Sequence, residues 1–510
     1  MKNDSGSSVS PWMATRAEAT SELTLTHDAK CDVCIVGAGI AGMSVAYSLA
    51  RVGKSVVVID DGPIGGGETS RTTAHLSNAI DDRYFEIEKQ FGEKKARLAA
   101  ESHTSAIARI EAIAAEEKID CSFVRVDGYL FVAPGESRED LERELKAAHR
   151  AGLTEVARVE RAPIDGYDTG AALLFPHQGQ FHPLKYLEGL AHAIKRTGGR
   201  IFTRTHVSKI EGGSPARIET NSGPLVTASA VVVATNTPVN DRVAIHTKQA
   251  AYRTFVIGAR VPRGSVVRAL YWDTLDPYHY VRLQSVSSEH DLLIIGGEDH
   301  KTGQEDDSNA RFARLETWAR ERFRAIEAIE FRWSGQVMET VDGLAFIGRN
   351  PMDKDNVYIA TGDSGMGMTH GTIAGILFTD LILGRKNPWA ELYDPSRKIV
   401  SAASDFVREN INVAKQYTDF LTPGDIHSEN DIPPGTGAII RRGFKKLAIY
   451  RDEKGALHER SAVCPHLGCI VAWNSLENSW DCPCHGSRFD AYGKVINGPA
   501  ISDLARLDKL

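Results

Sequence analysis

The sequence predicts an α/β fold: a nucleotide-binding domain with an inserted antiparallel-sheet domain, followed by a small all-β domain. Three observations predict this arrangement. A strand, a glycine-rich turn, a helix and a second strand occupy residues 32–60, strand-like runs succeed one another over residues 251–298, and short strands begin near Ala438. A chain of 510 residues is expected to form two or three domains.

The composition is that of an ordinary globular protein, with 42% hydrophobic and 25% charged residues. The net charge of −7 argues against a nucleic-acid partner. The most apolar run, GTIAGILFTDLILG, is too short for a membrane span and contains Asp380. Residues 1–28 are polar and lack the apolar core of a secretory signal, so we expect a surface arm on a cytoplasmic protein.

The segment CDVCIVGAGIAGMSVAYSLARVGKSVVVIDD contains a complete dinucleotide-binding fingerprint of the Rossmann type. Gly37 permits a tight turn, Gly39 lets a pyrophosphate approach the helix N-terminus, and Gly42 lets the helix and strand pack closely. Asp60 ends the second strand, where its carboxylate can bind the hydroxyls of a ribose. The loop GPIGGGETSRTTAHLS follows at once and is expected to pass the rest of a bound cofactor.

The remaining segments alternate between helices and strands. Residues 82–120 have a helical pattern, FVRVDGYLFVA reads as a strand, and FHPLKYLEGLAHAIKRTGGRIF reads as a helix and a strand. The run Ala230–Ala234 is expected to return to the first sheet. NVYIATGDSGMGMTHGTIAGILF gives a strand, a glycine run and a helix whose N-terminus favours an anionic group.

The seven cysteines are unevenly placed. Cys31 and Cys34 lie on a strand, where residues three apart face opposite sides, so we interpret them as buried side chains rather than a redox pair. Two Cys–His pairs occur near the C-terminus, in CPHLGC and CPCHGS. Structural zinc sites usually combine C-x2-4-C with H-x3-5-H or use cysteine alone, and mixed pairs with two further cysteines fit them poorly. A Rieske [2Fe–2S] centre, with two thiolates on one iron and two imidazoles on the other, fits well.

Both motifs closely resemble those of the Rieske family. The resemblance implies that Cys464 and Cys482 bind one iron, that His466 and His485 bind the other, and that a disulfide joins the two loops. The cysteines of that disulfide would be Cys469 and Cys484. The resemblance also implies that the Ser487 hydroxyl donates to a bridging sulfide, and it places Phe489 where high-potential members carry a tyrosine. The reduction potential is therefore expected below the top of the Rieske range, which is about +300 mV.

The front four-fifths of the chain resembles the glycine oxidase and D-amino-acid oxidase family. The resemblance rests on the glycine fingerprint, the GGGET loop, the FHP segment and GDSGMGMTHG. It implies FAD, with the flavin ring between Arg71–His75 and Met366–Thr369. We expect non-covalent binding, and His75 is the nearest candidate for a covalent attachment. The residues expected to bind FAD are Gly37, Gly39, Ile40, Ala41, Gly42, Asp60, Asp61, Gly67, Thr69, Arg71, Thr72, Thr73, Val207, Ala234, Thr235, Gly362, Gly365, Met366, Gly367, Met368 and Thr369.

These resemblances divide the chain into an FAD-binding Rossmann-like domain with an inserted substrate domain, and a Rieske domain. The expected bounds are 1–28 for the N-terminal arm, 29–395 for the oxidoreductase, 396–435 for a helical linker and 436–510 for the Rieske domain. Within the oxidoreductase, the FAD-binding parts are residues 29–80, 185–240 and 335–390, and the substrate-domain parts are residues 81–184 and 241–334.

The substrate is less clearly indicated. Several family members bind the substrate carboxylate with the arginine of a W-x-G-x-R motif, and Val337 takes that place in WSGQV. Tyr278, Tyr280 and Arg282 share one face of a strand and either line the pocket or form part of a solvated sheet. Arg253 is a weaker candidate of the same kind. Together with Arg71 and His75, which lie in the flavin loop, the three strand residues are the candidate catalytic residues.

A flavin takes two electrons from a substrate, whereas a [2Fe–2S] cluster takes one at a time. The leading hypothesis is an FAD-dependent dehydrogenase or oxidase of a small amine or related molecule, with a Rieske outlet to an external one-electron carrier or reductase. A flavin-dependent monooxygenase fed through the cluster is the first alternative, and a redox sensor or electron-transfer module is the second. A Rieske non-haem oxygenase is disfavoured because Leu174 stands where an acidic iron ligand would be expected near His177 and His182. A homo-oligomer stays open.

Overall fold

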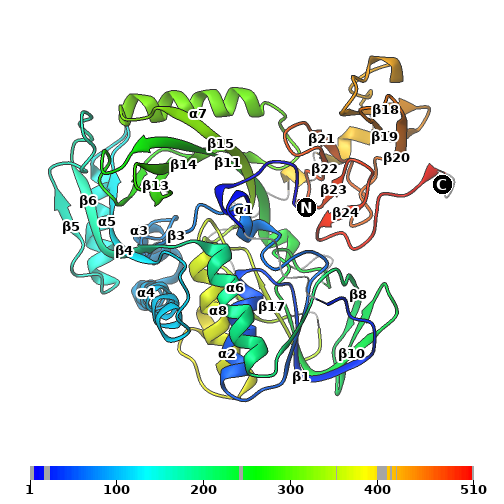
Figure 1. Cartoon of the computed structure of the whole chain (residues 1–510), viewed down its shortest axis with the longest axis horizontal. Coiled ribbons are helices and arrows are strands. Elements are labelled where there is room, and N and C mark those ends of the chain that lie inside the picture. Colours follow the sequence, from blue (N-terminus) through cyan, green and yellow to red (C-terminus); the bar gives the residue numbers. More distant parts are fainter. Residues whose placement is uncertain are drawn as a thin grey trace.

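The computed structural model describes residues 5–16, 23–240, 245–351, 353–398, 411–413, 416–420 and 422–507. The nucleotide fingerprint lies in a mainly parallel sheet of order β16-β17-β10-β1-β2-β7 (Figure 1). Its strands are β1 (Ala29–Val36), β2 (Val56–Ile59), β7 (Arg200–Phe202), β10 (Leu225–Val233), β16 (Phe346–Arg349) and β17 (Val357–Thr361), and the antiparallel pair β8 (Val207–Glu211) and β9 (Ala216–Thr220) extends it from β10. Residues of β2 and β17 are buried throughout, as expected of parallel strands covered on both faces.

Three helices lie side by side against this sheet: α2 (Ile40–Arg51), α6 (Pro183–Arg196) and α8 (Gly367–Ile382) (Figure 1). Two glycines of α8 bring it close to α2. A Cβ built on Gly371 would lie 3.0 Å from the Ala41 nitrogen, and one on Gly375 would lie 2.8 Å from the Ser44 carbonyl oxygen. The close approach holds the N-termini of α2 and α8 near each other.

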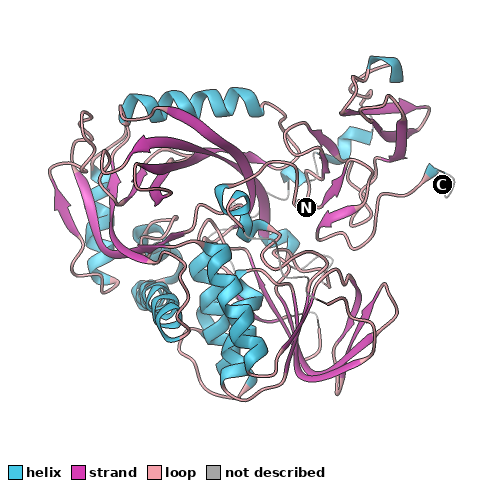
Figure 2. Cartoon of the chain, in the orientation of Figure 1, coloured by secondary structure: helices cyan, strands magenta, loops and turns pink. Residues whose placement is uncertain are grey.

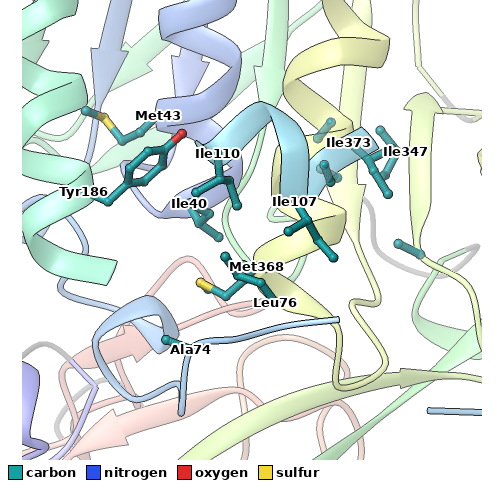
Figure 3. Close-up of a cluster of buried hydrophobic side chains, with 14 of the residues drawn as sticks. Ile40, Met43, Ala74, Leu76, Ile107, Ile110, Tyr186, Ile347, Met368 and Ile373 are labelled. Atoms are coloured by element: carbon teal, nitrogen blue, oxygen red, sulfur yellow. The ribbon is translucent and has the colours of Figure 1, made fainter. Parts of the chain in front are cut away.

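The other helices are α1 (Pro11–Ala14), α3 (Tyr84–Phe91), α4 (Glu93–Glu116), α5 (Glu139–Arg150), α7 (Ser308–Arg322) and α9 (Ala390–Tyr393). Helix α4 packs on α8, so that Ile107 and Ile110 share one buried cluster with Ile40, Met368 and Ile373 (Figure 3). Burying such side chains contributes about 1.5–3 kcal/mol each to folding. This core packs beneath the glycine turn and supports it.

The inserted domain is a second, mostly antiparallel sheet of order β15-β11-β14-β13-β12-β4-β6-β3 (Figure 2). Its strands are β3 (His75–Leu76), β4 (Val124–Phe131), β5 (Ala157–Val159), β6 (Ala172–Gln180), β11 (Gln249–Pro262), β12 (Leu270–Asp273), β13 (Tyr280–Ser285), β14 (His290–Lys301) and β15 (Ala328–Thr340). Helix α7 packs against β11 and β14. Strands β3 and the end of β15 come from segments that the sequence assigns to the FAD-binding parts, yet they pair in this sheet.

The C-terminal domain consists of two small antiparallel sheets (Figure 1). One contains β18 (Thr436–Arg442), β19 (Lys445–Arg451) and β20 (Leu457–Ser461), and the other contains β21 (Ala472–Asn474), β22 (Ser479–Asp481), β23 (Arg488–Asp490) and β24 (Val495–Asn497). Much of the expected helical linker, including residues 399–410, lies outside the described residues. Within the described residues, no helix is both long and apolar enough to cross a bilayer.

Residues 5–12 of the expected N-terminal arm pack into the protein instead of forming a surface arm. Ser5, Ser8, Ser10 and Trp12 are all buried, and α1 packs on α6. The Trp12 indole donates a hydrogen bond to the Thr72 carbonyl at 2.6 Å. A polar, serine-rich stretch can be buried here because the hydroxyls of Ser5 and Ser8 donate to Glu68 and to Glu477 of the C-terminal domain.

Candidate functional site

A deep cavity lies between the first sheet, the second sheet and the C-terminal domain. Most residues expected to bind FAD line it, from the glycine turn to the start of α8. These are Gly37, Gly39, Ile40, Ala41, Asp60, Asp61, Gly67, Thr69, Arg71, Thr72, Thr73, Val207, Ala234, Thr235, Gly365, Met366, Gly367 and Met368. The cavity ends among aromatic residues of the second sheet, Trp272, Tyr278 and Tyr280.

Three residues expected at the cofactor do not line the cavity. Gly42 packs against β1, and a Cβ there would overlap the Gly37 carbonyl oxygen. Gly362 has φ +72° and is backed by the Thr340 side chain. The Thr369 hydroxyl is turned into the core, 2.8 Å from His103 Nδ1. All three support the site by packing behind the cavity lining. A sequence motif does not distinguish this packing role from direct contact with the cofactor.

The geometry of the glycine turn suits a dinucleotide. Gly37 has φ +109°, and a Cβ there would overlap the Ala234 carbonyl oxygen, so a larger residue could not form the turn. The Asp60 carboxylate accepts hydrogen bonds from the nitrogens of Ala38 at 2.6 Å and Gly62 at 2.7 Å. The carboxylate is thereby fixed at the cavity edge, where a ribose can reach it.

The three candidate arginines contact other groups of the protein. Arg71 lines the cavity with part of its side chain, but its guanidinium pairs with Glu477 at 3.0 Å. The Arg253 guanidinium faces Glu477 and Asp481 at the domain interface. Arg282 donates to the carbonyls of Thr73, Ala74 and Phe181 and lies outside the cavity wall. Each one supports backbone or binds a buried carboxylate, which spacing in the sequence cannot reveal.

Tyr278, Tyr280 and His75 do face the cavity. The His75 ring lies edge-on to Tyr280 with 5.7 Å between the ring centroids. Burial, aided by the Arg282 charge, lowers the pKa of His75 to about 3, so this imidazole is neutral. The Tyr280 hydroxyl is hydrogen-bonded to Thr254 at 2.6 Å. These groups form a polar and aromatic wall at the end of the cavity near Trp272.

Carboxyl groups that the sequence did not single out line the same end of the cavity: Asp81, Asp299, Glu339 and Asp363. Burial raises the pKa of Asp81 to about 6 and those of Asp299 and Asp363 to about 7, and it raises that of Glu339 well above its usual range. Among the described residues, Arg71 is the only lysine or arginine in the lining, and its charge is engaged by Glu477. This end of the cavity is therefore rich in buried carboxyl groups.

The four predicted iron ligands lie on two loops of the C-terminal domain. Cys464, Cys482 and His485 are buried, and the ring centroids of His466 and His485 are 5.0 Å apart. The His485 Nδ1 atom is buried without a hydrogen-bond partner among the described residues. Burial, together with the His246 charge, lowers the pKa of His485 to about 4, so its imidazole is neutral, as a metal ligand requires. Two thiols and two such imidazoles fit a Rieske cluster.

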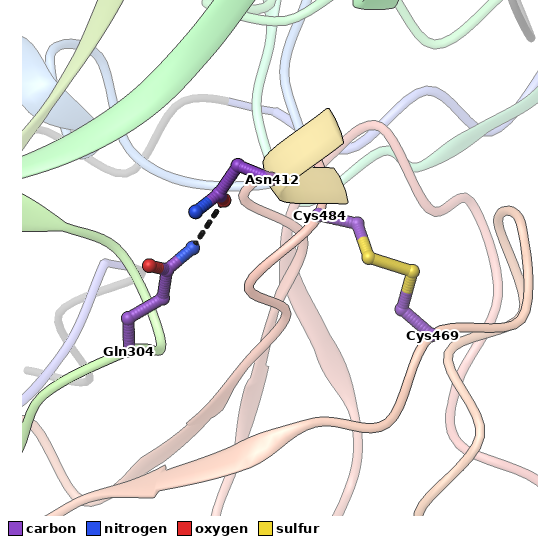
Figure 4. Close-up of a disulfide and its surroundings, with 4 residues drawn as sticks. All are labelled: Gln304, Asn412, Cys469 and Cys484. Atoms are coloured by element: carbon purple, nitrogen blue, oxygen red, sulfur yellow. Dashed lines mark hydrogen bonds between the residues drawn. A yellow bond between two sulfur atoms is a disulfide. The ribbon is translucent and has the colours of Figure 1, made fainter. Parts of the chain in front are cut away.

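The two remaining cysteines form the disulfide Cys469–Cys484, which joins the two loops (Figure 4). The same close-up includes Gln304 of the second sheet region, whose amide donates to Asn412 at 2.8 Å. The pairing that the resemblance implied is therefore present. Cys31 and Cys34 are unpaired and buried, as expected.

The second ligand loop is pressed against the wall of the cavity. The Gln336 amide of β15 donates to the Gly486 carbonyl at 3.0 Å, and Gln336 also lines the cavity. His246 lies beside both histidine ligands, with ring centroids 4.8 Å from His466 and 5.9 Å from His485. Neither Gln336 nor His246 belongs to a recognisable motif, so neither could be selected from the sequence.

A buried charge cluster fixes this docking. Glu477 accepts hydrogen bonds from Ser8 and Ser334, and it pairs with Arg71 at 3.0 Å. Arg488 of β23 donates to the Ser5 carbonyl at 2.7 Å and pairs with Asp481. The N-terminal segment around Ser5 and Ser8 therefore lies between the oxidoreductase part of the chain and the C-terminal domain, and it contacts both.

Comparison with known proteins agrees with both sites. Residues 32–381 match the family of FAD dependent oxidoreductases, and residues 423–508 match the Rieske [2Fe-2S] domain. The Bacillus subtilis (strain 168) protein YhfW, named as a Rieske 2Fe-2S iron-sulfur protein, is 34% identical over 95% of this chain and 94% of its own length.

Two further relatives cover the front of the chain. Gamma-glutamylputrescine oxidoreductase of Escherichia coli (strain K12) is 29% identical over 71% of this chain and 85% of its own. The crystal structure of glycine oxidase from Geobacillus kaustophilus superimposes with a TM-score of 0.60 and 22% identity, covering 73% of this chain and all of that one. The chain therefore belongs to the family of FAD dependent oxidoreductases, and it carries a Rieske [2Fe–2S] domain in its C-terminal part.

Proposed function

We propose that the protein is an FAD-dependent dehydrogenase of cationic amines that delivers electrons singly, through its Rieske domain, to an external acceptor. One observation carries the proposal: the strand that lines the substrate cavity also binds the cluster loop. Gln336 belongs to the cavity wall and donates to Gly486, the residue next to His485. The two redox sites therefore share one wall within one chain.

The end of the cavity near Trp272 favours a cation. Asp81 and Asp299 face a cavity with aromatic walls, and Val337 lines it where an arginine would bind a carboxylate. Buried carboxylates attract an ammonium group strongly, because the local dielectric is low. The name of the relative gamma-glutamylputrescine oxidoreductase also supports an amine. Aromatic rings add to the attraction through contacts between a cation and a ring face.

The chain's own residues prepare the amine. Asp299 Oδ1 is buried without a hydrogen-bond partner among the described residues, so it can accept a proton from a bound ammonium group. Burial places the pKa of Asp299 at about 7, which suits proton exchange near neutral pH. Tyr278 and Tyr280 restrict the position of the substrate. FAD, when bound, accepts two electrons from the amine, and the cluster takes electrons one at a time.

An anaerobic titration of the purified holoprotein tests this function. Diamines and monoamines are added in the absence of oxygen, and the flavin absorbance and the Rieske EPR signal are recorded together. Loss of the flavin absorbance followed by the signal of the reduced cluster supports the proposal. Flavin that responds only to an external reductant, with oxygen consumed and a hydroxylated product formed, contradicts it and favours a monooxygenase.

A matched variant separates the two redox sites. Cys482→Ser removes an iron ligand, and we expect it to leave the loss of flavin absorbance by amine intact while abolishing the EPR signal and the reduction of an external one-electron acceptor. If acceptor reduction continues unchanged in this variant, electrons leave the flavin directly and the Rieske outlet is wrong.

A further inference from the structure

The C-terminal domain contributes a wall to the dinucleotide cavity. Residues 495–501, which we call the C-terminal cap, contain β24 and the turn that follows it. The cap residues that line the cavity are Val495, Ile496, Asn497, Gly498, Ala500 and Ile501. The glycine turn and Asp60, the carboxylate expected to bind a ribose, line the same cavity. A group bound along the glycine turn is therefore covered by a segment of the other domain.

Three contacts hold the cap against the first domain. The Asn497 amide donates to Glu68 at 3.4 Å, and Glu68 follows the GGG loop beside the cavity. A Cβ built on Gly498 would lie 3.1 Å from Val239, so the backbone itself makes this contact. His206 bridges the closure: its Nδ1 lies 3.0 Å from Asp61, and its Nε2 lies 3.2 Å from the Ile501 carbonyl.

The cap is also tied to the cluster loop. The Ala500 nitrogen donates to the Ser487 hydroxyl at 3.0 Å, and Ser487 lies two residues after His485. Strand β24 pairs with β23, which begins at Arg488 directly after that loop. Asp503 accepts from the Val495 nitrogen at 3.0 Å and closes the turn. A change in the order of the cluster loop therefore reaches the cap through adjacent backbone.

We propose that the C-terminal cap is a removable wall of the FAD site, so that FAD release requires the cap to move and cluster loading strengthens FAD retention. The inference rests on FAD occupying this cavity. The cap covers the end marked by Asp60 and Asp61, where the fingerprint places the ribose of the adenosine. By thermodynamic linkage, if the loaded cluster raises the affinity for FAD by a given factor, bound FAD raises the affinity for the cluster by the same factor.

The first test measures the rate of FAD release from full-length holoprotein, followed by the rise in free-flavin fluorescence after dilution. Asn497→Ala/Ile501→Ala removes the amide contact and an apolar side chain of the cap, and we expect release to accelerate at least tenfold. Asn430→Ala/Val286→Ala is the matched control, because both residues are exposed and lie outside the cavity. Equal acceleration in the control, or none in the cap variant, would overturn the proposal.

The second test addresses the coupling. Cys482→Ser should raise the FAD release rate, and the effect should be less than additive with that of the cap variant, since both act through one wall. In Ile501→Cys, alkylation of the new cysteine should be slowed at least tenfold by FAD, as read by peptide mapping. If FAD binds tightly but does not slow alkylation at position 501, and if its release does not respond to loss of the cluster, the proposal for the cap is wrong while the proposed function stands. Protein that binds no FAD contradicts the proposed function as well.

Discussion

The Glu477 carboxylate lies 3.0 Å from the Arg71 guanidinium, and both side chains are fully buried. Burial alone would raise the pKa of Glu477, but Arg71, Arg253 and Arg488 outweigh it and hold the pKa at about 2. One ion pair therefore connects the C-terminal domain to the loop beside the cavity, in a place where an unpaired charge is costly.

Replacing Glu477 should loosen the C-terminal domain. Glu477→Ala leaves two arginines buried without their carboxylate, and we expect a loss of about 3–5 kcal/mol in the unfolding free energy of the docked domain. Urea unfolding monitored by tryptophan fluorescence measures this loss. Glu289→Ala, at an exposed site, is the control and should stay within about 0.5 kcal/mol of the parent.

The same carboxylate predicts an acid limit for docking. Its folded-state pKa is depressed, so its stabilising contribution is present above the unfolded value of about 4.5 and is lost as the pH falls towards about 2. Protease susceptibility of residues 396–435, measured between pH 6 and pH 3, should rise below about pH 4.5 and should rise less in Glu477→Gln. The same acid response in both proteins would exclude Glu477 as its source.

Amine binding should strengthen as the pH rises through 6 to 7. Burial raises the pKa of Asp81 to about 6 and that of Asp299 to about 7, so both become negative over this range and attract a cation. Asp299→Asn should raise KM for a diamine at least tenfold, lower kcat because the proposed proton acceptor is lost, and remove the upper part of the pH dependence. Asp165→Asn, on the surface, should leave the profile unchanged.

Restoring the family's arginine should alter specificity. Val337→Arg places a guanidinium in an acidic cavity, where it repels an amine and can bind a carboxylate in bidentate fashion. We expect kcat/KM for amines to fall at least tenfold and activity with α-amino acids to rise. Val337→Leu controls for size. An arginine variant that keeps its full activity on amines would show that charge at this position does not select the substrate.

The Ser487 hydroxyl should tune the cluster. The Ser487 oxygen accepts a hydrogen bond from the Ala500 nitrogen. Hydrogen bonds from Cys482, and to a smaller extent from Ser487, lower the pKa of the Cys464 thiol. Ser487→Ala removes a donor that stabilises negative charge, so the midpoint potential should fall by about 60 mV, the equivalent of a tenfold change in a one-electron equilibrium. A redox titration followed by EPR measures it, with Ser461→Ala as control.

Local motifs allowed much of the fold to be predicted. The glycine turn, Asp60 and the helix after Met366 depend on backbone geometry within a few residues, and those features identify themselves in the sequence. The iron ligands and the disulfide are similarly local, because each loop brings its own pair. Resemblance then supplied the cofactors, which the family and domain matches support.

The functions of the arginines could not be predicted, because they depend on distant partners. Arg71 meets a carboxylate 406 residues away, and Arg282 meets carbonyls about 200 residues away. The carboxyl groups of the cavity are equally scattered: Asp81, Asp299 and Glu339 come from three segments and share no motif. Residues that only tertiary packing brings together have no characteristic spacing in the sequence, so their grouping could not be predicted from it.

The buried position of Ser8 has a consequence for biosynthesis. This serine is synthesised 469 positions before its partner Glu477. The stretch around Ser8 must stay undocked until Glu477 has been made, so its docking follows the synthesis of both domains. Insertion of iron and sulfide into the newly made loops then competes in time with the step that buries them.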